Sequence, residues 1–210
     1  MKRAVILFAV LCILAGGASA QQIRTSPFEG RWIWDGKGED YPDFTELVFF
    51  GNVMLGTDED YPVYEGETFT YTGRTINFGN DYYEWEYRLS GNVLAITDEY
   101  DEHFSYTKAT IEKSPIEGIW KQTGGADYDP DYDYYCLFTG NIMAEGDEYG
   151  YDGVKIEFSG KIFHPSRVYL GEDISEKQLM ETAIEYRISG RSLTLISPDG
   201  EDEITLTKIY

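Results

Sequence analysis

The chain repeats one long series of motifs, and this repetition constrains its fold more than any other feature. Three stretches of the first half return in the same order in the second: SPFEGRW as SPIEGIW, FFGNVML as FTGNIMA, and EYRLSGNVLAI as EYRISGRSLTLI. A repeat of this length is a whole structural unit. We therefore predict two units of one fold, at residues 27–109 and 115–210, with almost no linker between them.

Apolar and polar residues alternate within each unit, which is typical of strands with one dry and one wet face. Residues 83–89 read YEWEYRL and residues 154–158 read VKIEF. Turn residues such as Gly51-Asn52 separate the short apolar runs. The main departure is an insertion at about 165–183, where a few residues could form one or two helical turns. The pattern predicts about eight short strands in each unit.

A meander of antiparallel strands loses its exposed edges when it closes into a barrel. The sequence therefore predicts an all-β chain of two tandem small antiparallel meander barrels, each with about eight short strands. Eight strands enclose a space just wide enough for side chains to fill, so we expect filled interiors and no large ligand cavity.

A Gly-x-Trp motif opens each unit, as Gly30-x-Trp32 and Gly118-x-Trp120. We expect each tryptophan to plug one end of a barrel, while each glycine lets the backbone approach closely. With the Ser-Gly turns and the closing Thr-Lys pairs, these motifs resemble the small lipocalin-like domains of exported bacterial proteins. The resemblance implies an eight-stranded calycin-type barrel in each unit. Each unit is much shorter than a full ligand-carrying lipocalin.

The first 20 residues have the pattern of a secretory signal peptide. Lys2 and Arg3 precede an apolar run that ends in the small residues Ala18-Ser19-Ala20, and the run is too short to cross a membrane as a helix. We predict cleavage before Gln21 and a mature protein in the periplasm or outside the cell. Cys136 is then the only cysteine, so no internal disulfide is expected, and we predict a buried, unreactive thiol.

The chain is strongly acidic, with a formal charge of −21 that becomes about −23 once residues 1–20 are removed. Such a surface repels nucleic acid and favours cations or basic partners. Integral membrane insertion is not expected either, because the strands are short and carry charges on alternate residues, such as Glu84, Glu86 and Arg88. Two interpretations of the charge stay open: it serves solubility, or it attracts a partner.

Motifs for catalysis or cofactor binding are not found. His103 and His164 have no metal-ligand spacing to another His or Cys, and no nucleophile elbow or phosphate-binding loop occurs. The alternating aspartates Asp127, Asp129, Asp131 and Asp133 are the only calcium candidates that we single out, and they lack the glycine and terminal glutamate of an EF-hand loop. We therefore predict no enzyme and no cofactor.

The function that the sequence favours is that of an exported, non-enzymatic binding or interaction protein with an unknown ligand. Two alternatives stay open: a carrier of a small apolar ligand, and a periplasmic hydrolase that acts on glycans or peptides through an acidic pair. The partner is expected to be a protein, a glycan or a small apolar molecule.

Overall fold

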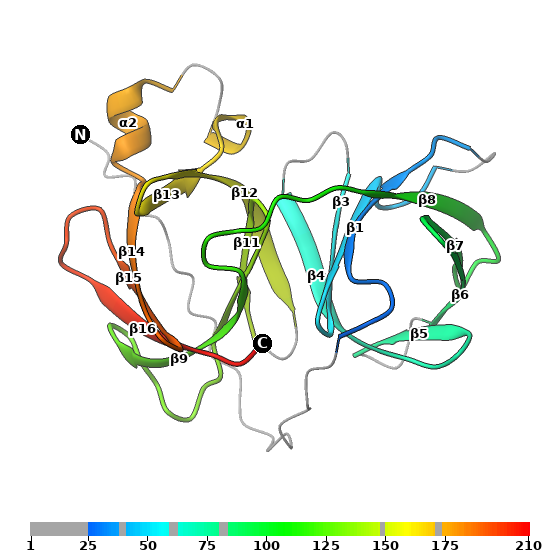
Figure 1. Cartoon of the computed structure of the whole chain (residues 1–210), viewed down its shortest axis with the longest axis horizontal. Helices are drawn as coiled ribbons and strands as arrows, with labels where there is room; N and C mark the ends of the chain where they lie inside the picture. The colour runs from blue at the N-terminus through cyan, green and yellow to red at the C-terminus, as the bar shows by residue number, and fades with distance from the viewer. Residues whose placement is uncertain (1–24, 38–40, 59–62, 80–83, 148–149, 171–173) are drawn as a thin grey trace.

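A computed structural model describes residues 25–37, 41–58, 63–79, 84–147, 150–170 and 174–210. The predicted signal peptide lies outside these residues. The described chain is an all-β structure in which antiparallel strands form one 16-stranded sheet (Figure 1). The predicted all-β, antiparallel character is confirmed.

A closed eight-stranded antiparallel barrel forms the second half of the chain. Its strands are β9 (Gly118–Gly125), β10 (Tyr135–Thr139), β11 (Ile142–Gly146), β12 (Tyr151–Ser159), β13 (Ile162–Pro165), β14 (Ile184–Ser189), β15 (Ser192–Ile196) and β16 (Glu203–Lys208). Each strand pairs with the next along the chain, and β16 returns to pair with β9. We call this set of strands the second ring.

Eight further strands belong to the first half. They are β1 (Gly30–Trp34), β2 (Glu46–Phe50), β3 (Val53–Thr57), β4 (Val63–Tyr71), β5 (Thr75–Phe78), β6 (Glu84–Ser90), β7 (Val93–Thr97) and β8 (His103–Ala109). Each pairs with the next along the chain and β8 pairs with β1, so that these pairings also run in a circle. We call this set the first ring.

The two rings share strand pairing, which the sequence did not predict. Strand β4 of the first ring pairs antiparallel with β12 of the second, and the two lie side by side at the centre of Figure 1. Tyr64 lies opposite Gly153 and Tyr151 lies opposite Gly66, while Glu65 faces Asp152. These residues are repeat counterparts, because the stretch Tyr-Glu-Gly of β4 corresponds to Tyr-Asp-Gly of β12. The contact therefore has pseudo-twofold symmetry.

Three apolar clusters stabilise this arrangement. One fills much of the first ring, around Phe49, and one fills the second ring, around Phe138. The third lies between the rings and includes Val48, Leu55 and Leu137. Strands β2 and β3 are consequently buried on both faces, which explains why they read as continuous apolar runs and do not alternate.

The insertion in the second half contains two short helices, α1 (Arg167–Leu170) and α2 (Glu176–Met180). A capping box begins α2: the hydroxyl of Ser175 accepts a hydrogen bond from the backbone N–H of Gln178, whose side chain accepts one from the Ser175 N–H. Leu179 is buried and anchors the helix. The one or two helical turns that the sequence allows are therefore present here.

The tryptophan of each Gly-x-Trp motif is buried under a lysine from the closing Thr-Lys pair. The Trp32 indole donates a hydrogen bond to the carbonyl of Phe28 (2.6 Å), and its ring centre lies 5.1 Å from Nζ of Lys108. The indole of Trp120 donates in the same way to Ile116 (2.9 Å) and lies 5.3 Å from Nζ of Lys208. In each unit, the tryptophan near the start of the repeat therefore makes a cation–π contact with the lysine near its end.

The glutamate and the glycine of the opening motif also have structural roles. The Glu29 carboxylate accepts a hydrogen bond from the backbone N–H of Gly51 in the β2–β3 turn, and Glu117 does the same for Gly140 in the β10–β11 turn. At Gly118 the backbone has φ +149°, and a Cβ atom there would lie 2.6 Å from Cε of Lys208. These contacts give the repeated glutamate, glycine and tryptophan a role in stabilising the fold.

Candidate ligand-binding site

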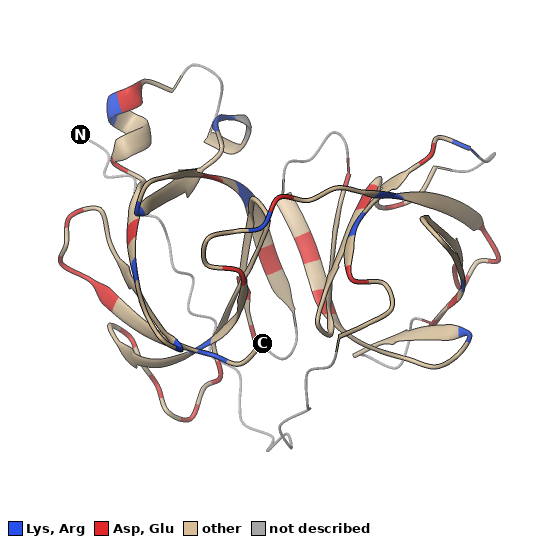
Figure 2. Cartoon of the chain, viewed as in Figure 1, with Lys and Arg blue, Asp and Glu red and all other residues tan. Residues whose placement is uncertain are grey.

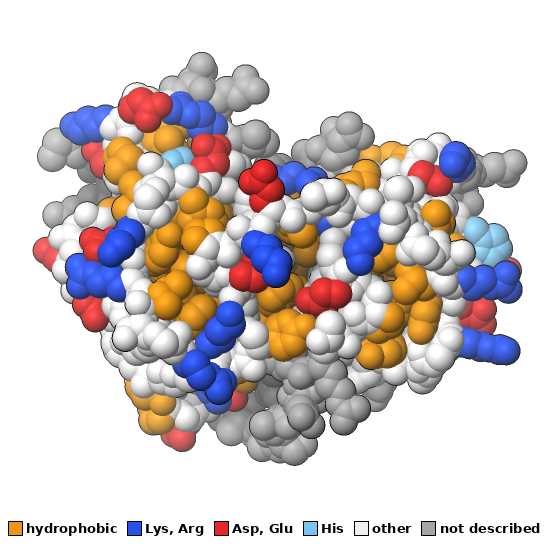
Figure 3. Space-filling view, viewed as in Figure 1, with side chains coloured by type: hydrophobic (Ala, Val, Ile, Leu, Met, Phe, Trp, Pro, Cys, Tyr) orange, Lys and Arg blue, Asp and Glu red, His pale blue; other side chains and the backbone are white. Residues whose placement is uncertain are grey.

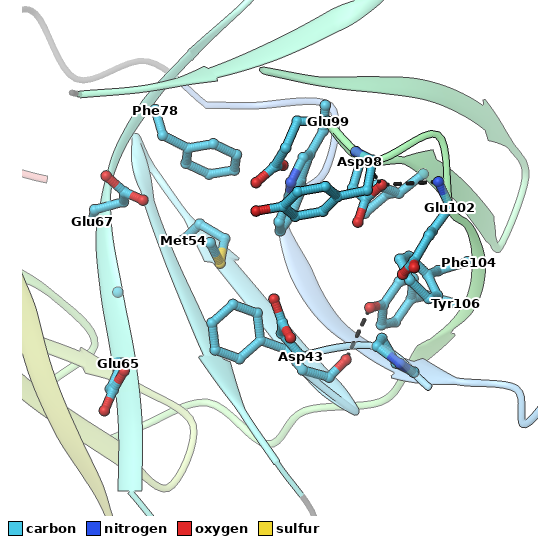
Figure 4. Close-up of a pocket in the computed structure, with 16 residues that line it drawn as sticks. Asp43, Met54, Glu65, Glu67, Phe78, Asp98, Glu99, Glu102, Phe104 and Tyr106 are labelled. Carbon is cyan, nitrogen blue, oxygen red and sulfur yellow. Dashed lines mark hydrogen bonds between the residues drawn. The ribbon is translucent and has the colours of Figure 1, made fainter. Parts of the chain in front are cut away.

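A cavity of about 630 Å³ opens in the first ring. This volume lies within the range of ordinary small-molecule sites, which is about 300 to 1,000 Å³. The interior of the first ring is therefore not filled, and here the structure differs from the expectation of side-chain-filled interiors. Figure 4 shows the side chains that surround the cavity.

One part of the cavity wall is apolar and mostly aromatic. It is formed by Phe44, Met54, Phe78, Trp85, Ile96, Phe104 and Tyr106. The Tyr106 hydroxyl donates a hydrogen bond to the carbonyl of Phe44 (2.9 Å), and burial raises the pKa of Tyr106. The rings of Phe78 and Trp85 meet edge to face at 4.6 Å. These contacts hold the aromatic wall in a fixed arrangement.

Carboxylates form the polar part of the cavity. They are Asp43, Glu65, Glu67, Asp98, Glu99 and Glu102. No lysine or arginine is among the described residues that line the cavity. Glu65 and Glu67 come from β4, whereas Asp98, Glu99 and Glu102 come from the turn between β7 and β8, so that acidic groups face the space from different sides (Figure 4).

The turn that supplies one side of this acidic lining is held by its own aspartate. The carboxylate of Asp98 accepts hydrogen bonds from the backbone N–H groups of Tyr100 and Glu102, both at 2.9 Å. The positive φ of Asp101, +66°, belongs to the same turn. Asp98 therefore has a structural role in the turn.

Glu67 has a different environment. It lies opposite Met54 in the β3–β4 register and is partly buried, and burial raises its pKa. In the described part of the chain, no hydrogen bond or ion pair of its carboxylate is found. A carboxylate that is partly desolvated without a partner is destabilised in its charged form, so it favours an incoming cation.

The second ring has side chains where the first has space. Its repeat counterpart of Gly56 is Glu145, which accepts a hydrogen bond from the hydroxyl of Tyr134 inside the barrel. At Gly56 a Cβ atom would lie only 2.4 Å from the ring of Phe44. The glycine therefore allows Phe44 to lie against the barrel wall, while Tyr134 and Glu145 occupy the corresponding interior in the second ring.

Cys136 lies beside this pair and is fully buried, as the sequence predicted. Burial raises the pKa of its thiol, which keeps it protonated and unreactive at neutral pH. Burial also raises the pKa of Glu145. Tyr134, Cys136 and Glu145 thus form a buried polar cluster in the core of the second ring.

The calcium candidates lie between β9 and β10 and are all exposed. The carboxylate of Asp129 accepts from the backbone N–H of Asp131 (2.9 Å), and Asp133 pairs with Lys121, which lowers the pKa of that carboxyl. In the described residues, which include Asp127 and the other three, no group of three or more His, Cys, Asp or Glu side chains could hold a metal ion.

Sequence reasoning missed the residues around the cavity. One signal was available, because the repeat comparison sets Glu67 against Val154 and Gly56 against Glu145. Both differences lie at inward-facing positions. Gly56 leaves the first ring with less side-chain volume, and Glu67 gives it an additional charge. Gly30, Trp32, Gly118 and Trp120 lie outside the cavity lining.

Charged and apolar side chains are distributed over both halves of the surface. Figure 2 shows acidic residues along β4 and β12 and in many connecting segments. Figure 3 shows apolar side chains gathered in the middle of each half on this face, with charged side chains around them. Within the described residues, no helix combines the length and the apolar character needed to cross a bilayer.

Comparison with known proteins identifies no family. No protein-family model matches the chain, and no curated protein matches it significantly. Two solved structures are similar at 10% identity and a TM-score of 0.21: the DNA polymerase III subunit beta from Pseudomonas aeruginosa and the DNA polymerase sliding clamp from Pseudomonas aeruginosa with ligand. They cover 88% and 89% of this chain, which spans 58% of the length of theirs. A TM-score this low supports no conclusion about fold or function.

Proposed function

We propose that the protein is an exported, non-enzymatic binding protein built from two lipocalin-like barrels in tandem, and that its first ring binds a small ligand. The observation on which this rests is the cavity of about 630 Å³, with an aromatic wall and six carboxylates. Small-molecule sites combine apolar surface, which supplies affinity, with polar groups that supply orientation. The second ring, whose interior holds Tyr134 and Glu145, supports the first through the shared sheet.

The proposed ligand site is tested by a substitution that fills the cavity with a larger side chain. Met54 lies in the cavity wall and projects toward the space between Phe78 and the carboxylates (Figure 4). We expect Met54→Trp to weaken binding of the neutral dye Nile red by at least about tenfold, because the larger side chain takes up the ligand volume. The measurement is a fluorescence titration of the dye with wild type and variant.

The repeat offers a matched control for this experiment. Met143 is the counterpart of Met54 and packs against the core of the second ring. Met143→Trp adds the same volume to the other half and should leave Nile red binding within about twofold of wild type. Equal loss in both variants, or no saturable binding to the wild type, would remove the support for a ligand site in the first ring.

Export is tested separately, by the mass of the protein from its native host. We expect the intact mass of the exported fraction to correspond to a chain that begins at Gln21, because signal peptidase cleaves after a small-x-small sequence. A chain found only in the cytosolic fraction and still carrying residues 1–20 would contradict this part of the proposal. The result for export does not affect the result for the cavity.

A further inference from the structure

We propose that the ligand of the first ring is an organic cation, in which a protonated amine or a quaternary ammonium group is attached to an apolar body. This inference rests on the proposed function and narrows it to a ligand class. The aromatic wall would hold the apolar body, and the carboxylates would hold the charge. The proposal excludes two classes of ligand, purely apolar compounds and anions.

The charge of the lining is the first argument. Among the described residues that line the cavity, six are acidic and none is basic. In a cleft with low-dielectric walls, charges of one sign reinforce one another and raise the local concentration of the opposite ion. An anionic ligand, such as a fatty acid, would be repelled by the carboxylates of this cavity.

The second argument is that three of the six lining carboxylates are not already neutralised. Elsewhere in the molecule buried carboxylates have partners: Glu46 pairs with Arg31, and Glu145 accepts from Tyr134. Glu65, Glu67 and Glu99 line the cavity, and within the described residues no ion pair or hydrogen bond of their side chains is found. Glu67 is partly buried, and a partly buried charge without a partner costs stability, which a bound cation would recover. Glu65 and Glu99 are exposed and add to the negative field of the cavity.

The arrangement favours an organic cation over a metal ion. A divalent metal needs several oxygens converging on one point. No such group occurs among the described residues, and the cavity carboxylates face it from β4 on one side and from the β7–β8 turn on another. Spread charges of this kind match a ligand whose positive charge is itself spread over a bulky head group.

Aromatic faces provide a further reason. Trp85, Phe78 and Tyr106 line the same cavity as the carboxylates. The negative face of an aromatic ring attracts ammonium groups, most strongly when the group is partly desolvated. The molecule uses this interaction already, where Lys108 lies over Trp32 and Lys208 over Trp120.

The comparison of the two rings supports the assignment. Glu67 is opposite Met54, and its counterpart Val154 is opposite Met143 in the same register. Val154 packs against the apolar core of the second ring. The position is therefore acidic, as Glu67, in the first ring, which has the cavity. It is apolar, as Val154, in the second ring, whose interior is filled by Tyr134 and Glu145.

The test uses three compounds that share a phenylbutyl body and differ in charge: 4-phenylbutylamine, 4-phenylbutanol and 5-phenylpentanoate. Binding is measured by calorimetry and by displacement of Nile red at neutral pH. We expect the amine to bind about tenfold more tightly than the alcohol, because attraction by the lining exceeds the cost of desolvating the ammonium group, and the carboxylate to bind more weakly than the alcohol, because the lining repels it.

Neutral isosteres of the carboxylates test the mechanism. The double variant Glu65→Gln, Glu67→Gln should lose most of the preference for the amine and keep the affinity for the alcohol. The matched control is Glu84→Gln, Glu86→Gln, which removes the same charge from exposed alternate positions of β6 and should keep the preference. A loss in both doubles would indicate a general effect of net charge and would overturn the site assignment.

Two outcomes separate this inference from the proposed function. If the amine and the alcohol bind equally to the wild type, and Met54→Trp weakens both, the cavity binds ligands but the cation inference is wrong. If neither the dye nor any of the three compounds binds, the proposed function fails and the inference fails with it.

Discussion

Replacing Trp120 by alanine is expected to lower the free energy of unfolding by about 4 kcal/mol, which is the usual cost of truncating a large aromatic side chain in a core. Trp120 is 2% exposed, donates a hydrogen bond to Ile116 and lies under Lys208. The alanine variant loses all three interactions and leaves a cavity. Urea denaturation followed by near-ultraviolet circular dichroism measures the change.

Two further variants separate the causes of this loss. Trp120→Phe keeps most of the volume but not the indole N–H, so we expect a smaller cost, about 1 to 3 kcal/mol, from the unpaired carbonyl and the lost contacts. Ile188→Ala truncates an apolar side chain that is 45% exposed and should change stability by no more than about 0.5 kcal/mol. If Trp120→Ala lowered the free energy of unfolding as little as Ile188→Ala, the structural role assigned to the Gly-x-Trp motif would be contradicted.

Removing the carboxylate of Glu46 is expected to cost about 3 kcal/mol, because it leaves buried polar partners without an acceptor. Oε2 of Glu46 lies 2.6 Å from Nη2 of Arg31 and 3.8 Å from Nζ of Lys155, and its Oε1 accepts from the hydroxyl of Tyr64 at 2.6 Å. The Glu46 side chain is only 9% exposed. Since Lys155 belongs to the second half, this network also joins the two rings.

The control for this prediction removes the partners together. In Glu46→Leu, Arg31→Leu neither charge of the ion pair is left alone, so we expect part of the stability to return, while the buried Tyr64 hydroxyl still lacks its acceptor. Glu46→Ala is the variant to compare with it by urea denaturation. A cost below about 0.5 kcal/mol for Glu46→Ala would contradict the view that the pair is sequestered from water.

Local sequence rules were sufficient for the strands. The alternating runs EWEYRL and VKIEF lie within β6 and β12, because alternation and tight turns act over a few neighbouring residues. The all-β fold class follows from the same signals. Repeat comparison added the expectation that both halves follow one strand order.

The pairing between β4 and β12 and the cavity could not be predicted in the same way. Both depend on where residues distant in sequence meet. Strand β4 extends over nine residues, and its first part, near Tyr64, pairs with the second half. The cavity depends on positions without a large side chain, in particular Gly56, and the absence of a side chain produces no periodic pattern in the sequence.

The pseudo-twofold pairing of β4 with β12 has the form of a contact between two copies of one chain. Joined end to end, the copies form this contact within a single molecule, so its formation does not depend on protein concentration. If the protein is exported, as we propose, it is diluted into a large volume, where a weak dimer would dissociate. Covalent linkage keeps the shared strand pairing intact at any dilution, and it leaves each half free to change separately while the contact persists.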